Sequence, residues 1–257
     1  VHDHAYLAFL RDAHSEWVAT GQDWGNEVMS NVYRRSEGEP LGILAKAAHF
    51  LADGSCPIGP NTARSAYAAA QSAVAAADAV AAGAPVAFAL ARPPGHHARA
   101  DAAGGFCYLN NAAIAAQRLR GTCQRVVVLD IDMHHGQGIQ EIFYHRDDIF
   151  YISIHGDPLN FYPVVSGHAS EVGEGVGTGF NLNIPLPHGS DAATFFQALD
   201  QALAAANTFA PQAMVLAMGF DTYREDPQSK MTIDTPDFAT MAQRLVRCGW
   251  PTAIVFE

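Results

Sequence analysis

The sequence predicts a single α/β domain of three layers, in which helices cover both faces of a mostly parallel sheet. Short runs of apolar and β-branched residues alternate with longer helical patterns along all 257 residues, which is typical of such a sheet. The short runs are almost continuously apolar, as strands covered on both faces must be. Hydrophobic residues make up 49% of the chain, and no repeat or linker-like composition divides residues 1–257.

The predicted elements follow one another in an order that suits this fold. A first helix is predicted over residues 5–18. An alanine-rich second helix covers residues 61–82, with Asn61 or Thr62 at its N-cap and Gly83 just past its end. The candidate strands cover residues 86–90, 126–131, 149–154, 213–218 and 252–256. Further helices are predicted between them, over residues 108–120, 192–207 and 236–248.

Two irregular stretches and the two ends of the chain depart from this pattern. Residues 21–42 and 156–188 show no clear periodicity, and long loops in a compact domain are usually functional. We expect residues 21–42 to be a loop insertion at the active-site mouth or a dimer interface. The chain starts inside a predicted helix and stops at Glu257, directly after a buried strand. We therefore expect it to lack the first strand region and the C-terminal end of its domain.

Composition narrows the classes of partner and compartment. A formal net charge of −11 argues against a nucleic-acid partner, because binding nucleic acid needs a clustered positive field. The same charge suits a cationic substrate, although many acidic proteins are acidic for solubility alone. The four cysteines form no CxxC pair and are interpreted as reduced core residues. No signal-like start or membrane-length apolar run is present, so no membrane partner and a cytoplasmic location are predicted.

Polar residues alternate at the end of one predicted strand, at Asp130, Asp132 and His134. Side chains two apart in an extended segment point to the same face, so these three should converge. Asp221 follows the strand over residues 213–218 and would reach the same sheet edge, where ligand sites of parallel α/β folds gather. Zinc accepts such a mixture of nitrogen and oxygen ligands. The alternative is a solvated acidic cluster without a metal.

The segment RPPGHHA at residues 92–98 follows another predicted strand. Its prolines and glycine fix the backbone, so that His96 and His97 can project into a cleft. A histidine near a metal-bound water can act as its general base when a carboxylate or amide orients the ring. A histidine pair alone is more often accidental, but its position at the same sheet edge as the acidic cluster favours catalysis.

A glycine-rich turn, GGFCYLNN at residues 104–111, leads into a predicted helix. It lacks the GxGxxG pattern and the Walker lysine of a phosphate-binding loop. Two interpretations stay open: the glycines allow a ligand to approach the backbone while Phe106 forms a pocket wall, or the segment is a helix entry with a buried phenylalanine.

Together these segments resemble the histone deacetylase family of the arginase/deacetylase superfamily. The resemblance rests on six segments in order along the chain: VHDHAYLAFL, RPPGHHA, GGFCYLNNAAIAA, VVVLDIDMHHGQGIQEIF, YISIHGDP and GFDTYREDP. Within that family, WGNEVMSN at residues 24–31 and NFYP at residues 160–163 are most similar to the acetylpolyamine amidohydrolases of bacteria.

The resemblance implies a role for each matching residue. Zinc would be held by Asp132, His134 and Asp221. His97 would be the general base, and His96 its electrostatic neighbour, tied to Asp130. The substrate channel would involve Phe106, Tyr162 and the carbonyl of Gly105. A structural potassium ion would lie at Asp130, Asp132, His134, Ser153 and Ile154.

Two departures from the family pattern bear on activity. Gln137 stands where many members carry Asp or Asn beside the general base; it can accept an N–H bond but cannot be anionic. The family's oxyanion-stabilising tyrosine lies in a Gly-Gly-Tyr run that would follow Glu257. We therefore expect the 257 residues alone to hold metal yet to turn over slowly, because one such donor contributes ~2.7–4 kcal/mol.

The resemblance implies zinc-dependent hydrolysis of acetylated amines, with acetylpolyamines as the expected substrates. Acetyl-lysine in proteins is the first alternative, and a metal-binding but inactive module is the second. The acidic residues Asp23 and Glu27 and the aromatic Trp24 of the 21–42 insertion favour a polycationic substrate. The family also implies a homodimer, and the ligand set would accept ferrous iron or cobalt in place of zinc.

Overall fold

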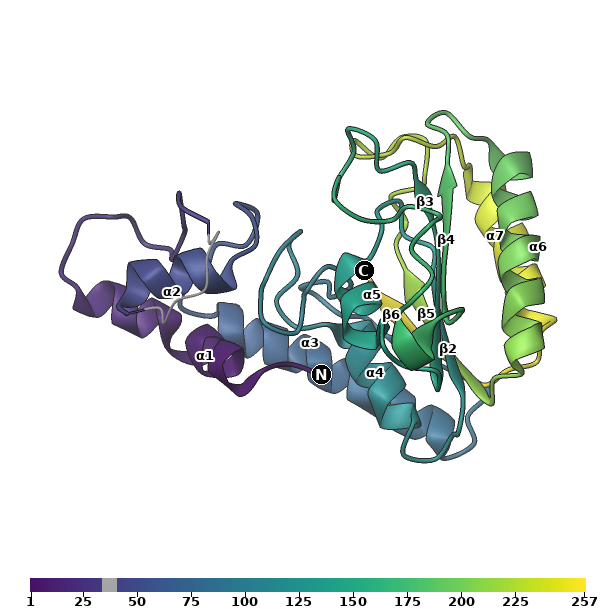
Figure 1. Ribbon diagram of the computed structural model, residues 1–257, viewed down its shortest axis with the longest axis horizontal. Coiled ribbons are helices and arrows are strands. Elements are labelled where there is room, and N and C mark those ends of the chain that lie inside the picture. Colours follow the sequence, from purple (N-terminus) through teal and green to yellow (C-terminus); the bar gives the residue numbers. More distant parts are fainter. Residues whose placement is uncertain (34–40) are drawn as a thin grey trace.

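A computed structural model describes residues 1–33 and 41–257, and it confirms the α/β fold class (Figure 1). Six parallel strands form one sheet in the order β1-β6-β5-β2-β3-β4. The strands are β1 (Val86–Ala89), β2 (Val126–Asp130), β3 (Ile149–Gly156), β4 (Asn181–Leu186), β5 (Ala213–Met218) and β6 (Thr252–Phe256). The helices are α1 (His4–Ala19), α2 (Ile43–Phe50), α3 (Thr62–Ala81), α4 (Asn111–Leu119), α5 (Gln137–Phe143), α6 (Ala192–Phe209) and α7 (Thr235–Val246), with a 3₁₀ turn at Gly175–Gly177.

The central strand β2 divides the core into two layers, because its alternate side chains point to opposite faces. Val126 and Val128 pack with α3, α4 and α5, whereas Val127 and Leu129 pack with α6 and α7 on the other face. All five residues of β2 are buried, as the apolar run predicts for a strand covered on both sides.

Strand register brings the predicted site to one edge of the sheet. Asp130 at the end of β2 lies opposite Ser153 of β3 and Ala217 of β5. The residues that follow β2 and β5 therefore leave the sheet side by side. This arrangement places polar residues at the carboxyl ends of the strands, where open α/β sheets bind ligands.

The ends of the predicted helices lie within a few residues of the predicted bounds. Side-chain caps set some of these ends. The side chain of Asn110 accepts the amide of Ala113 and starts α4 three residues after the predicted start. Asp234 and Asp237 form a reciprocal capping box at the start of α7. Asn61 occupies the N-cap position of α3 but makes no side-chain cap bond.

Strand β4 corrects the prediction that residues 156–188 are irregular throughout. Its sequence NLNIPL alternates asparagine with apolar residues and contains Pro185, which is a turn signal in a single sequence. Proline is tolerated on edge strands, and β4 pairs only with β3 among the described strands. The prediction was wrong because it interpreted the proline and asparagines as turn residues and did not consider that an edge strand tolerates them. The short helices α2 and α5 were not predicted either.

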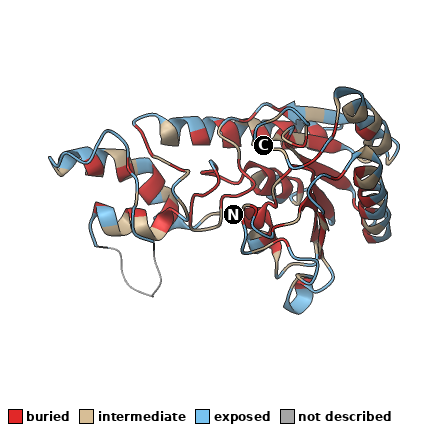
Figure 2. Cartoon of the chain, turned by 90° about the horizontal axis from the view of Figure 1, so that it is seen from above, coloured by how far each residue is buried: buried red, intermediate tan, exposed pale blue. Residues whose placement is uncertain are grey.

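Helices α1 and α2 form an arm beside the sheet, together with the loops around them (Figure 1). Its small core includes Tyr6, Phe9, Trp17 and Phe50, and is separate from the two layers beside the sheet. Figure 2 shows that the buried residues of the arm lie on the inner sides of its helices. Within the described ranges, no helix is long and apolar enough to cross a membrane.

Candidate metal centre and active site

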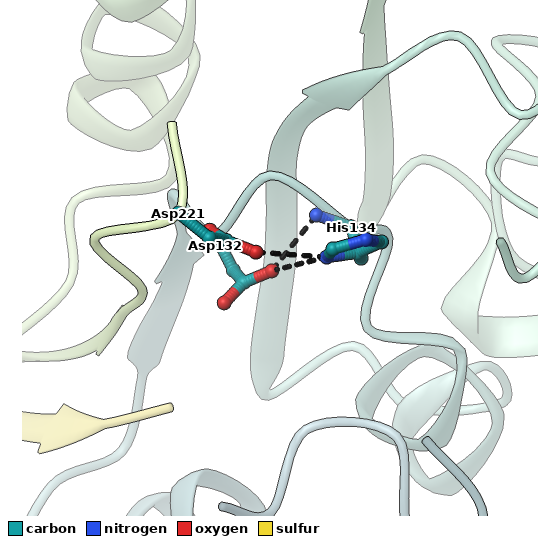
Figure 3. A group of neighbouring side chains, drawn as sticks. All are labelled: Asp132, His134 and Asp221. Carbon is teal, nitrogen blue, oxygen red and sulfur yellow. Dashed lines mark hydrogen bonds and ion pairs between the residues drawn. The ribbon is translucent and has the colours of Figure 1, made fainter. Parts of the chain in front are cut away.

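Three side chains that could hold a metal ion meet at the carboxyl ends of β2 and β5 (Figure 3). Asp132 and His134 lie two residues apart in the segment after β2, and Asp221 follows β5. Nδ1 of His134 lies 2.8 Å from Asp221 Oδ2 and 3.2 Å from Asp132 Oδ1. One ligand atom from each residue lies within 4.8 Å of those of the other two. The predicted convergence of separate segments is therefore present in the fold.

The geometry of this cluster fits a divalent ion. A tetrahedral zinc with bonds of about 2.0–2.2 Å holds its ligands about 3.3–3.6 Å apart, which small side-chain rotations would give here. Burial alone would lower the pKa of His134, but its bonds to Asp132 and Asp221 raise that pKa to about 9. Burial and the charge of Asp132 raise the pKa of Asp221 to about 6. The two carboxylates thus favour a positively charged group in the space between them.

Gly219 makes the approach of the two ligand segments possible. A Cβ at this position would lie 1.9 Å from Oδ2 of Asp132, closer than any side chain can be placed. We infer that glycine is required between β5 and Asp221 because the two segments touch here.

His96 is held between two carboxylates. Its Nδ1 lies 3.1 Å from Asp130 Oδ2, and its Nε2 lies 3.8 Å from Asp132 Oδ1. Burial would lower the pKa of His96, but Asp132 and Asp130 outweigh it and raise that pKa to about 10. Tyr151 donates a further hydrogen bond of 3.0 Å to Asp130. The two carboxylates therefore favour the protonated form of His96 and fix its ring in place.

His97 lies next to it in a different environment. Its Nδ1 donates to Oε1 of Gln137 at 2.7 Å, which leaves Nε2 to accept a proton. Burial, and then the charge of His96, hold the pKa of His97 well below its usual range. The two adjacent rings thus differ in environment: nearby carboxylates favour the protonated form of His96, whereas burial and the charge of His96 favour the neutral form of His97.

The end of β6 holds the turn that carries both histidines. Oε2 of Glu257 accepts the backbone amides of Gly95 and His96, at 2.5 and 2.9 Å. Burial raises the pKa of Glu257 to about 7. The sequence marked this residue only as a strand end, because its partners lie some 160 residues away.

A cavity of about 440 Å³ opens above the cluster. It brings His96, His97 and the three residues of the cluster together with Phe106 and Tyr162. The cavity is lined by Ser55, Pro94, His96, His97, Gly105, Phe106, Asp132, His134, Tyr162, Phe220, Asp221, Asp226, Gln228, Phe256 and Glu257. Phe220 and Gln228 were not predicted, because loop residues beyond β5 carry no periodic signal.

The glycine-rich turn shapes one wall of this cavity. A Cβ on Gly105 would lie 2.3 Å from Cδ2 of His97, so the backbone packs directly on the imidazole ring. Phe106 has a φ of 68°, a backbone angle that is rare for a phenylalanine, and its side chain is exposed. The structure thus favours the pocket-wall interpretation over a buried helix entry.

Comparison with known proteins agrees with this site. The histone deacetylase domain matches residues 1–257. The chain belongs to the histone deacetylase family. Membership makes it a hydrolase domain of a metal-dependent family, and the Asp-His-Asp cluster is a possible site for that metal.

Individual deacetylase relatives cover the whole chain. It is 59% identical over 257 residues to an acetylpolyamine amidohydrolase of Burkholderia pseudomallei and 44% identical over 263 residues to acetylpolyamine amidohydrolase 1 of Pseudomonas aeruginosa. It spans 75% of each relative's length. A crystal structure of the acetylpolyamine aminohydrolase from Burkholderia pseudomallei superposes with a TM-score of 0.98 at 59% identity, over all of this chain and 75% of that one.

The remaining predicted residues of this deacetylase domain lie close to the centre. Ser153 is buried on β3 opposite Asp130, and its hydroxyl lies 2.8 Å from Nδ1 of His155. Ile154 follows it in the same strand. Residues 34–40 of the predicted insertion lie outside the described residues, and none of residues 21–33 lines the cavity.

Proposed function

We propose that this deacetylase domain hydrolyses the amide bond of acetylated polyamines, releasing acetate and the free amine. One observation carries the proposal: His97, whose Nδ1 is held by Gln137, lies beside the Asp132, His134 and Asp221 cluster in the lining of one cavity. A binding module has no use for a proton acceptor at this position. The inactive-module alternative is therefore the weaker one.

The residues divide the work of hydrolysis between them. Asp132, His134 and Asp221 would hold zinc, which when bound polarises the amide carbonyl and lowers the pKa of a bound water. His97 would take the proton of the attacking water, and Gln137 fixes its ring through Nδ1. Nδ1 of His96 is held by Asp130 at 3.1 Å and its Nε2 faces Asp132 at 3.8 Å, which leaves His97 as the acceptor.

Two ions are part of this proposal. Zinc fits the nitrogen and oxygen ligands, and ferrous iron or cobalt would fit the same set. A structural potassium ion is proposed near Asp130, Ser153 and Ile154, where β2 pairs with β3. Asp132 and His134 would contribute to it through their backbone.

The channel suits a slender cationic substrate. Phe106 and Tyr162 would enclose its alkyl stem, and the carbonyl of Gly105 would accept the amide N–H. Asp226 adds a carboxylate to the cavity lining. Relatives named acetylpolyamine amidohydrolases, at 59% and 44% identity, support polyamines over proteins as the acetylated partner.

Steady-state kinetics with three substrates test this assignment. We expect the metal-loaded enzyme to show a higher kcat/KM for acetylputrescine and acetylspermidine than for an acetyl-lysine peptide, because the carboxylates in the cavity lining suit small cations. Treatment with a chelator should abolish all three activities. A preference for the peptide would support the acetyl-lysine alternative, and hydrolysis of none would contradict the proposal.

We also propose that the protein forms a homodimer through the arm. The arm exposes large apolar side chains that its own core does not cover: Met29 (46%), Val32 (63%), Tyr33 (40%) and Leu41 (78%). Exposed apolar patches of this kind often mark an interface. A second subunit placed here could bring its insertion to the mouth of the cavity.

Light scattering measures the expected dimer. The wild-type protein should have twice the mass of one chain, and Val32→Glu should shift it towards the monomer because it places a charge in the patch. Leu159→Glu is the matched control, because Leu159 is also exposed (71%) and lies outside the arm. A monomeric wild type at micromolar concentration would overturn the dimer.

A further inference from the structure

A chain of three hydrogen bonds connects the proposed base to a carboxylate that sequence reasoning missed. Nδ1 of His97 donates to Oε1 of Gln137 at 2.7 Å, and Nε2 of Gln137 donates to the hydroxyl of Tyr162 at 3.3 Å. That hydroxyl donates to Oδ2 of Asp53 at 2.7 Å. Every donor in the chain therefore points away from His97 and towards Asp53.

This common direction has an electrostatic consequence. Hydrogen bonds in series polarise one another, so an anion at one end strengthens the donors along the row. Gln137 carries no charge and cannot by itself stabilise an imidazolium. A carboxylate two side chains further along can do so in part, because each link passes on some of its polarisation.

Asp53 is built to stay ionised and in place. Its Oδ1 accepts the amide of Ser55 at 2.8 Å and also the Ser55 hydroxyl, and its Oδ2 accepts the amide of Gly105 at 3.0 Å. Although burial opposes ionisation, hydrogen bonds from Ser55 and Tyr162 hold the pKa of Asp53 below its usual range. Burial and Asp53 raise the pKa of Tyr162 far above neutrality, so its hydroxyl remains a donor.

We propose that Asp53 is a positioning residue that orients and polarises His97 through Tyr162 and Gln137. The inference rests on the proposed function, in which His97 takes the water's proton. It gives Tyr162 a second task besides lining the channel. It also explains how an uncharged glutamine can support the general base, because the negative charge comes from Asp53 in the loop before α3.

A competing explanation is that Asp53 only holds the loops that form the cavity wall. Its bonds to Ser55 and Gly105 would then matter, and its bond to Tyr162 would not. The two explanations differ in one respect: only the relay requires the Tyr162 hydroxyl. A double-mutant cycle isolates that dependence.

The cycle combines Asp53→Asn, which removes the charge, with Tyr162→Phe, which removes only the hydroxyl. We expect each single variant to lower kcat on acetylputrescine by about tenfold, in the range of ~10–100-fold typical of outer-shell partners, with KM and metal content unchanged. The double variant should lose no more than either single variant. Multiplied losses, or a wild-type kcat for Asp53→Asn, would overturn the relay.

A rescue experiment separates charge from loop structure. Gln137→Glu places a carboxylate directly on Nδ1 of His97, so Asp53→Asn should no longer lower kcat in that background. A persistent loss there would mean that Asp53 acts on the loops alone. Asp157→Asn is the matched control, because Asp157 caps the loop before Tyr162 through the amide of Leu159 and makes no bond to the hydroxyl.

The same assays keep the two proposals apart. A wild-type enzyme without activity on acetylated amines, or an active His97→Ala variant, would contradict the proposed function itself. An active wild type with an inactive His97→Ala variant, combined with additive losses in the cycle, would contradict only the role of Asp53.

Discussion

Asp221→Ala is expected to remove stoichiometric metal from the protein and with it all amide hydrolysis. Asp221 supplies one of only two carboxylates in the cluster, and its Oδ2 lies 2.8 Å from the ligand nitrogen of His134. Without it, two protein ligands remain, which is fewer than catalytic zinc sites use. Changes to outer-shell partners alone cost ~10–100-fold in metal affinity or activity, so the loss of a direct ligand should exceed that range.

Elemental analysis after dialysis measures the effect. Asp221→Asn is the matched variant, because its amide oxygen can still accept the Met133 amide that Asp221 Oδ1 accepts at 2.8 Å. It should also lose metal, which would separate ligation from folding. Glu225→Ala, an exposed residue of the same loop, should keep one ion per chain. Full metal content in Asp221→Ala would remove this residue from the site.

The second large effect is expected at His97. His97→Ala should lower kcat by ~10²–10⁴-fold, the usual contribution of a general base. His96→Ala should cost less, because Asp130 and Asp132 face the two ring nitrogens of His96 and favour its protonated form, which cannot accept a further proton. The difference follows from the opposite pKa shifts of two neighbouring rings.

The comparison needs matched metal occupancy, because His96 lies 3.8 Å from the ligand Asp132. kcat on acetylputrescine is then measured for both variants and for the wild type at saturating substrate. Equal losses at the two positions would show that the roles of the pair are shared or reversed.

The sequence alone predicted those site residues whose positions follow from a short segment or from a simple rule of sheet geometry. Asp132 and His134 alternate within one extended segment, so their common face follows from backbone geometry alone. Asp221 followed from the rule that parallel strands end at the same edge, and the structure brings it to the other two. The buried strands were also predicted well, because a short and continuous apolar run is typical of a strand that is covered on both faces.

Contacts that tertiary structure alone creates could not be placed in this way. Asp53 bonds to Tyr162 across 109 residues, and Glu257 to His96 across 161. Neither carboxylate has a neighbour in the sequence that suggests its partner. Strand β4 was missed because Pro185 and two asparagines hide an edge strand. The role of residues 21–42 stays a prediction, since it depends on a second subunit.

The most direct test of the account is anomalous diffraction from crystals of the metal-loaded protein, recorded on both sides of the zinc absorption edge. We predict one anomalous peak per chain, within bonding distance of Asp132 Oδ1, His134 Nδ1 and Asp221 Oδ2, at the floor of the cavity that contains His97. Crystals of Asp221→Asn should lack the peak. A peak elsewhere, or none at this cluster in a catalytically active crystal, would contradict the central claim.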